Sequence, residues 1–156
     1  MKLKKILFII GGTALGLVTV TLVGLFFLFL SWPSQKVQIG DDIEKYTQVY
    51  IEKHKLIDVE EKLLCYYDFS ETLNSTSCAL LTDHRVIMHV DFKSYFINLT
   101  DIVKITHYVD DYKGDIIQVI PRKGSPISVE IPPRRMGSVF LRELQREFNK
   151  KKSPTS

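Results

Sequence analysis

Residues 6–30 carry no charged side chain, and Lys2, Lys4 and Lys5 stand directly before them. A helix rises about 1.5 Å per residue and a bilayer core is about 30 Å thick, so about 20 apolar residues suffice to cross it. The sequence therefore predicts a transmembrane helix over residues 6–30, behind a basic tail of residues 1–5.

A cleaved secretory signal is the alternative for this segment. Such a signal has an apolar region of about 7–15 residues and a small-residue cleavage site. Here the apolar run is longer, and Ser31-Trp32-Pro33-Ser34 follows it without an A-x-A pattern. We expect an uncleaved signal-anchor, with Trp32 as an aromatic residue at the far membrane interface.

The basic tail predicts the orientation of the span. Three lysines precede it, whereas the residues that follow it mix fewer cations with acids. Since positive charges stay on the cytoplasmic side, we expect a single-pass protein of the cell membrane with a cytoplasmic N-terminus and an extracytoplasmic C-terminal domain.

Small residues recur within the predicted span. Gly12 and Gly16 form one G-x-x-x-G step, and Gly24 lies two such steps further on, although Val20 interrupts the row. Small residues on one face let two membrane helices approach closely, which predicts helix pairing with a partner or a second copy. The alternative is that glycine is simply common in membrane helices.

The residues after the span suffice for one compact domain. The whole chain has 21 Lys+Arg against 18 Asp+Glu, a balance that argues against nucleic acid as a partner. We predict a linker with a connecting helix over 31–60, a domain over 61–149 and a disordered basic tail over 150–156. The connecting helix is expected at 41–55, where Asp41 and Asp42 begin an apolar pattern of helical spacing.

From residue 61 the chain is rich in β-branched and aromatic residues, with turn residues every 8–12 positions, which is typical of antiparallel strands. We expect seven strands, at 62–70, 76–82, 85–91, 94–99, 102–109, 115–121 and 126–131.

A helix is predicted to follow, opening at Pro132-Pro133. Met136, Phe140, Leu144 and Phe148 step by four along it and form one apolar stripe. The fold class is thus a single transmembrane helix plus an α+β domain.

Three short motifs resemble those of bacterial pleckstrin-homology-like (PH-like) and GRAM-like domains. They are the stretch Leu81-Thr82-Asp83-His84-Arg85-Val86-Ile87, the preceding Glu61-Lys62-Leu63-Leu64 and the following Ile97-Asn98-Leu99-Thr100-Asp101-Ile102. The resemblance covers about residues 61–148. It implies a seven-stranded antiparallel β-barrel or sandwich capped by a C-terminal amphipathic helix. For Asp83 and Arg85 we expect a structural role at a tight corner rather than ligand binding.

Basic residues gather near the C-terminal end. Arg134, Arg135, Arg142 and Arg146 form the candidate binding surface, which would suit anionic lipid or an acidic protein partner. The alternative is a solvated helix face.

The two cysteines, Cys65 and Cys78, lie in neighbouring predicted strands. If the hairpin is centred near residues 71–72 they face each other and a disulfide is possible; a turn at 73–75 would separate them. Two buried free thiols are the alternative.

The sequence contains no nucleophile-elbow, zincin, C-x-x-C, Walker A or dinucleotide-binding motif. His54, His84, His89 and His107 have no spacing typical of a metal site. We therefore expect a non-enzymatic protein without metal or cofactor. It would be a membrane-anchored binding or scaffold module that tethers a protein partner or lipid surface. The alternative is a small structural subunit that assembles through its glycine-containing span.

Overall fold

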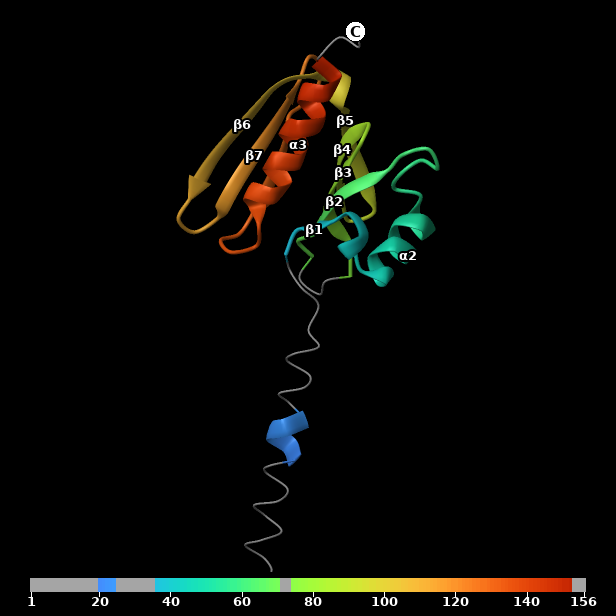
Figure 1. The fold of residues 1–156 in the computed structure, drawn as a ribbon, viewed down its shortest axis with the longest axis vertical. Coiled ribbons are helices and arrows are strands. Elements are labelled where there is room, and N and C mark those ends of the chain that lie inside the picture. The colour runs from blue at the N-terminus through green and yellow to red at the C-terminus, as the bar shows by residue number, and fades with distance from the viewer. Residues whose placement is uncertain (1–19, 25–35, 71–73, 153–156) are drawn as a thin grey trace, which may run out of the picture. The chain divides into compact units, whose positions relative to one another are not determined.

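The computed structural model describes residues 20–24, 36–70 and 74–152 (Figure 1). The chain divides into one unit of residues 1–34 and another of residues 35–156, and each is described by itself. Residues 20–24 are helical. Within the described ranges, no helix has the length and apolar character needed to cross a bilayer. Most of the predicted span, with Gly12 and Gly16, lies outside those ranges.

The second unit contains eight strands, two α-helices and two short 3₁₀ helices among its described residues. In chain order they are β1 (Gln38–Ile39), η1 (Gly40–Asp42), α2 (Lys45–His54), β2 (Leu63–Asp68), β3 (Ser77–Thr82), β4 (Arg85–Val90), β5 (Lys93–Asn98), η2 (Leu99–Asp101), β6 (Ile102–Asp110), β7 (Gly114–Pro121), β8 (Ile127–Ile131) and α3 (Gly137–Lys152).

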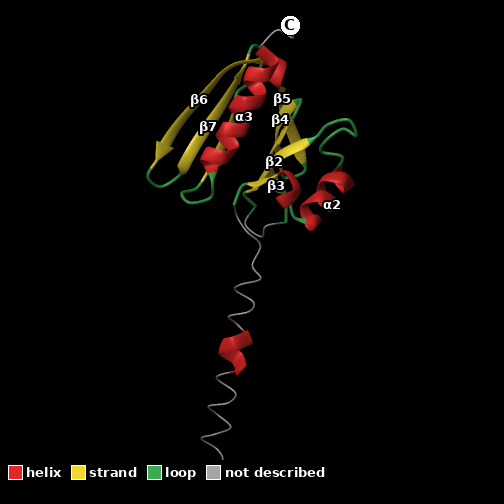
Figure 2. Ribbon diagram, in the orientation of Figure 1, coloured by secondary structure: helices red, strands yellow, loops and turns green. Residues whose placement is uncertain are grey.

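The strands form two antiparallel sheets, ordered β1-β2-β3-β4-β5 and β6-β7-β8 (Figure 2). Strands β2–β8 match the seven predicted strands, and a helix follows them as expected. This arrangement fits a PH-like α+β domain. The two sheets do not close into a barrel, because β5 and β8 are both edge strands without a hydrogen-bonded neighbour on one side.

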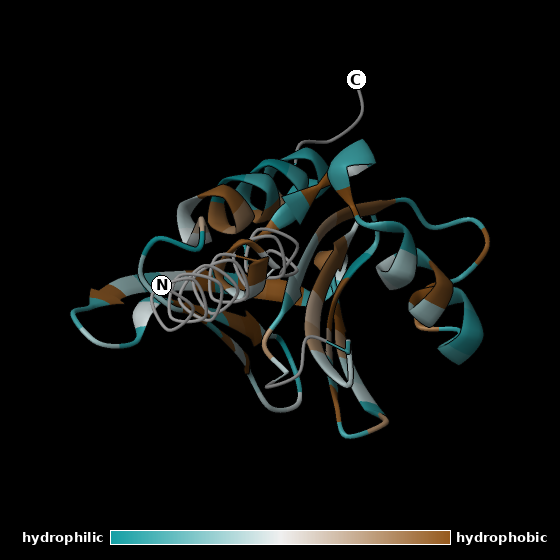
Figure 3. Ribbon diagram, turned by 90° about the horizontal axis from the view of Figure 1, so that it is seen from below, coloured by the Kyte–Doolittle hydropathy of each residue, from teal (hydrophilic) through white to brown (hydrophobic). Residues whose placement is uncertain are grey.

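Helix α3 fills one opening between the two sheets. Its Phe140 and Leu144 are fully buried in a core that includes Tyr67 and Ile97 of the first sheet and Ile117 of the second. A second, smaller core lies on the other face of the first sheet, where Ile51 packs with Leu80 and Ile87. In Figure 3 the strands are largely apolar, whereas α2 and α3 carry long hydrophilic stretches.

Both predicted helices need correction at their boundaries. The helix expected at 41–55 is divided, because Ile43 and Glu44 have extended backbone between η1 and α2. Helix α3 begins at Gly137 rather than at Pro132-Pro133, since Arg134 and Met136 have φ of 67° and 65°, which a right-handed helix excludes. It also continues to Lys152, so residues 150–152 are helical and not disordered.

Of the two alternatives for Cys65 and Cys78, the disulfide does not form. Cys65 pairs with Leu81, and Cys78 pairs with Asp68, so the register keeps the two cysteines apart. Cys65 belongs to the core between the sheets and Cys78 to the core under α2, on the opposite face. Both are buried free thiols, as the alternative predicted. Burial raises the pKa of Cys65 to about 12 and also raises the pKa of Cys78.

Candidate functional site

The candidate site lies where two edge strands, β5 and β8, meet. The two strands contact each other, yet each is hydrogen-bonded to a strand on its other side only. We call the line between them the seam. No helix in the described part of the chain covers the seam as α3 covers the other opening.

Two hollows run along the seam. One, of about 500 Å³, lies between β5 and the segment Pro121–Ser128. The other, of about 700 Å³, extends toward β2 and the loop before α3. Met88 and Ser128 line both hollows, and we call the two hollows together the seam groove.

The floor of the seam groove is apolar. Tyr67, Met88 and Tyr95 lie in one row across the first sheet, because Tyr67 pairs with Ala79, Ala79 with Met88, and Met88 with Tyr95. Tyr67 is buried, whereas Tyr95 is 58% exposed and Phe69, further along the floor, is 36% exposed. The second sheet thus leaves part of this inner face uncovered.

The rim of the groove is mainly basic. Lys113, Lys123 and Arg135 line it, against one carboxylate, that of Glu130, which lies 3.5 Å from the Lys113 ammonium. Burial raises the pKa of the Tyr67 hydroxyl, and neighbouring Arg135 partly opposes this. Lys123 and Arg135, toward the two ends of the groove, form no ion pair with a carboxylate of the described residues, although Asp101 lines a neighbouring hollow with Lys123.

One mouth of the groove is formed by the β2–β3 loop, and buried Asp68 organises this loop. The Asp68 carboxylate accepts hydrogen bonds from the amides of Ser70 and Ser75, at 2.8 and 2.9 Å, and from the Tyr66 hydroxyl at 3.0 Å. Ser75 adopts a φ of 64°, a left-handed conformation that few residues other than glycine take up. Asp68 thereby fixes the loop ends beside Phe69.

The free edge of β5 can be assigned residue by residue. The Leu99 amide donates to the His84 carbonyl at 2.8 Å, so the backbone groups of Leu99 point toward β4. Because backbone groups alternate along a strand, those of Ile97 and Tyr95 also point toward β4. The amides and carbonyls of Ser94 and Phe96 consequently point away from β4, in the plane of the sheet, into the seam.

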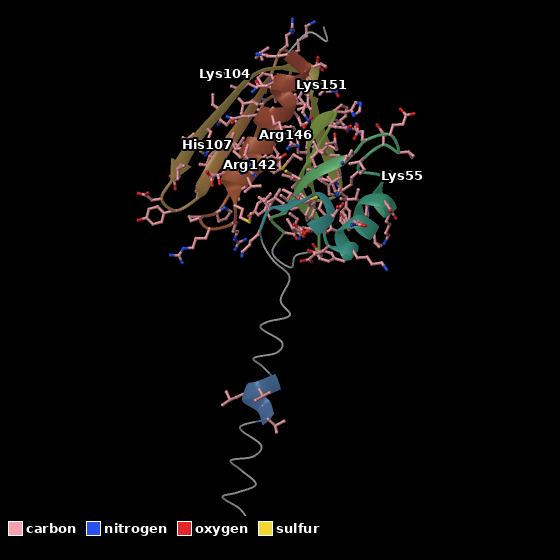
Figure 4. All side chains as sticks on the ribbon, viewed as in Figure 1. Lys55, Lys104, His107, Arg142, Arg146 and Lys151 are labelled. Atoms are coloured by element: carbon pink, nitrogen blue, oxygen red, sulfur yellow. The ribbon has the colours of Figure 1, made fainter. Side chains whose placement is uncertain are left out.

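The four candidate arginines do not form one surface. Arg142 and Arg146 lie on the exposed side of α3 (Figure 4), where Glu143 and Glu147 pair with them. Burial opposes ionisation of Glu147, yet hydrogen bonds from Lys150 and Arg146 hold its pKa below the usual value. The charges on this face are thus largely balanced, as the alternative of a solvated helix face predicted.

The other two arginines lie in the loop before α3. Arg134 is exposed, while Arg135 is half-buried and lines the seam groove. The Arg135 carbonyl accepts a hydrogen bond of 3.0 Å from the Val37 amide, which fixes this loop to the start of the domain. Of the four predicted residues, only Arg135 belongs to the groove.

Asp83 and Arg85 have the structural role that the sequence predicted. Asp83 accepts a 2.9 Å hydrogen bond from the Lys62 amide, and Arg85 pairs with Glu61 at 2.9 Å. The Arg85 guanidinium also lies 4.9 Å from the centre of the Phe96 ring, so it supports the edge strand from behind.

A small polar cluster joins α2 to the back of β5. The His89 ring lies within 3.1 Å of the Tyr50 hydroxyl and within 2.9 Å of Ser94 Oγ, and His54 is stacked on Tyr50. Burial and neighbouring His54 lower the pKa of His89. The part of the chain that the structure describes holds no group of three or more His, Cys, Asp or Glu side chains suited to a metal ion.

The seam groove was not predicted from the sequence. One signal was present: β5 reads Lys-Ser-Tyr-Phe-Ile-Asn, in which three apolar residues are adjacent where a half-buried strand would alternate. Consecutive apolar residues place side chains on both faces of the strand, and Tyr95 and Phe96 are both exposed. Whether β5 has a hydrogen-bonded neighbour on its second side depends on how the two sheets meet, and the sequence of a single strand does not show this.

Comparisons with known proteins complete the description. The sequence matches no protein-family model and no curated protein. Among solved structures, the chain is similar to a DUF1696 family protein with a pleckstrin-homology domain from Shewanella loihica PV-4. The TM-score is 0.47 and the sequence identity 12%, over 74% of this chain and 98% of that one.

Proposed function

We propose that this chain is a single-pass membrane protein whose folded unit binds a protein partner and so holds it at the membrane. The observation that carries the proposal is the pairing of an uncharged run of 25 residues, 6–30, with a folded unit that presents an open, basic-rimmed groove. The run is long enough to cross a bilayer, and such grooves are typical binding sites.

The mechanism is tethering. An anchor confines the binding unit to a thin layer at the membrane, where effective concentrations reach the millimolar range. A groove of modest affinity then suffices, and no chemical step is required. By the positive-inside rule, Lys2, Lys4 and Lys5 stay in the cytoplasm and the folded unit lies outside it.

Anionic lipid is a further contact within the same proposal. Arg134 is exposed in the loop before α3, and the Arg135 carbonyl beside it binds the segment through which the chain enters the folded unit. Cations near a membrane surface contribute about 1 kcal/mol each when the lipid is anionic. Such a contact would orient the folded unit at the membrane, and the groove would still bind the protein partner.

Retention in the membrane tests the anchor. We expect the full chain to stay in the membrane pellet after alkaline extraction. The variant V18R/V20R should move to the supernatant, since each arginine at the centre of a span costs about 2.5–3.5 kcal/mol. Extraction of the unaltered chain would contradict the proposal.

Labelling in intact cells tests the orientation. Cys65 and Cys78 are buried, and their raised thiol pKa values make them poor nucleophiles, so a Ser153→Cys reporter can be labelled with an impermeant thiol reagent against little background. Labelling without permeabilisation is expected. Labelling only after permeabilisation would place the folded unit in the cytoplasm.

A small structural subunit is the second candidate function. Gly24 is the one glycine of the predicted pairing face among the described residues, and it lies in a helical stretch, residues 20–24. Leucine at Gly12 and Gly16 should abolish association in the membrane if this function holds. Association that depends on groove residues instead favours the binding module.

A further inference from the structure

We propose that the seam groove binds an extended, acidic peptide segment of the partner protein, hydrogen-bonded to the free edge of β5 beside β8. The inference rests on the proposed function and defines the chemistry of its partner. The peptide would add a strand to the first sheet at its β5 edge.

The β5 edge supplies the hydrogen bonds for such a peptide. The amides and carbonyls of Ser94 and Phe96 point into the seam, and residues 93–96 are all exposed. A row of unpaired backbone groups is a template for a further strand. An extended backbone is therefore the ligand whose donors and acceptors fit this edge.

The composition of β5, compared with that of the edge strand β6, favours β5 as the strand that a peptide would join. Proteins protect exposed edges with charges or proline, and β6 carries Lys104 and His107 in its middle. The middle of β5, from Ser94 to Ile97, has neither charge nor proline, and its two exposed aromatic residues lie beside the hollows. An edge of this composition is expected to be covered in the working protein.

The floor of the groove would select the peptide side chains. A strand projects alternate side chains to one face, so one inward side chain of the peptide would lie beside Tyr95, at the end of the row that Tyr95 forms with Met88 and Tyr67. Apolar residues at the inward positions would cover the exposed part of the inner face. A strand of five to six residues, about 17–20 Å long, matches β5 in length.

The rim of the groove would select for negative charge. Lys123 and Arg135 lie toward opposite ends, and Glu130 is already paired with Lys113. Acidic residues at the outward positions of the peptide would meet these cations, whereas a basic peptide would meet only like charge. The preferred segment is thus an alternation of apolar and acidic residues.

Hydrogen exchange on the full chain in lipid nanodiscs tests the proposal. The probe is the synthetic peptide acetyl-Glu-Val-Glu-Val-Thr-Val-amide, with a counterpart in which lysine replaces both glutamates. With the acidic peptide we expect exchange at the Ser94 and Phe96 amides to slow by about tenfold or more. The amides of Tyr95 and Ile97, which already bond to β4, should change much less.

Matched variants locate the contacts. Tyr95→Thr should weaken binding of the acidic peptide at least about fivefold, because it removes a ring from the floor. Tyr112→Thr, in the exposed β6–β7 turn, should leave binding unchanged. Lys123→Glu should reduce the preference for the acidic peptide, while the same charge change at Lys104 on β6 (Figure 4) should not.

Other outcomes would overturn the inference. Equal binding of the two peptides, protection of β6 instead of β5, or no protection at all would each exclude it. Protection of Ser94 and Phe96 without peptide, rising with protein concentration, would assign the seam to a second copy of the chain. If the chain stays in the membrane but β5 gains no protection, this inference fails and the proposed function stands; alkaline extraction of the chain defeats the proposed function whatever the peptide does.

Discussion

The two openings between the sheets differ in how they are covered. At one, α3 buries Phe140 and Leu144 completely and its outer charges are paired. At the other, β5 and β8 leave Phe69, Tyr95 and Phe96 exposed, with unpaired cations on the rim. The first opening is closed by buried apolar packing, whereas the second leaves apolar side chains that the described fold does not cover.

The largest expected effect is the difference in unfolding free energy between a substitution at the covered opening and one at the seam. Phe140→Ala is expected to lower the free energy of unfolding by about 3–5 kcal/mol, because it leaves a cavity in the core. Tyr95→Ala, at the seam, should cost less than about 1 kcal/mol. Urea unfolding of the full chain in detergent, followed by pulse proteolysis, measures both. Equal losses would mean that the seam is a structural part of the core.

The next effect concerns the mouth of the seam groove. Asp68→Ala removes the acceptor of the Ser70 and Ser75 amides and of the Tyr66 hydroxyl, which leaves buried donors unsatisfied. We expect a loss of about 2–3 kcal/mol by the same unfolding measurement. Asp68→Asn keeps one acceptor oxygen and should lose less. If Asn and Ala cost the same, the carboxylate does not organise the loop through these bonds.

The third effect is a pH dependence of stability that arises from His89, behind the β5 edge. Burial, and next the charge of His54, lower the pKa of His89, so the unfolded chain takes up the proton first as the pH falls below 6.5. Stability should be complete above that pH and decrease as the pH drops through the lowered pKa of the folded state. Unfolding midpoints between pH 7.5 and 5 measure this dependence.

A matched pair of variants assigns the pH dependence. His89→Gln can still hydrogen-bond Tyr50 and Ser94 and should flatten the profile between pH 6.5 and 5. His54→Gln removes the neighbouring charge that lowers the pKa of His89 and should therefore reduce the slope only in part. An unaltered slope in His89→Gln would exclude His89 as its source.

The smallest effect is expected on the outer side of α3. Arg146 bridges Glu143 and Glu147 at 2.6 and 3.2 Å but is itself 51% exposed. Arg146→Ala should cost about 0.2–1 kcal/mol at low salt and less at high salt. Lys151→Ala on the same helix serves as the control. A loss above about 2 kcal/mol would make this face as important to stability as the core beneath it.

Local patterns predicted the strands well because each turn carries its own signal. The corner at Asp83-His84 and the turn before Gly114 separate strands whose observed bounds lie within one or two residues of those expected. Gly114 has a φ of 78°, and a Cβ there would collide with the Ile131 carbonyl, so that turn requires glycine. Such constraints act over a few residues and are readable in sequence.

Features that depend on distant partners were not predictable in this way. The two-residue strand β1 exists because Gln38 and Ile39 pair with Tyr66 and Cys65, and nothing in its own sequence indicates a strand. The register that separates Cys65 from Cys78 and the open seam depend likewise on how whole sheets meet. The four-arginine surface was inferred from charge alone, and the carboxylates that balance Arg142 and Arg146 became evident only in three dimensions.

The placement of the two cysteines has a practical consequence for how the protein matures. Their side chains lie on opposite faces of one sheet, so the folded unit contains no covalent cross-link that an oxidoreductase would have to install. We expect chemical reductants to leave its unfolding midpoint unchanged. The folded unit therefore needs no disulfide-forming step, whichever side of the membrane it occupies.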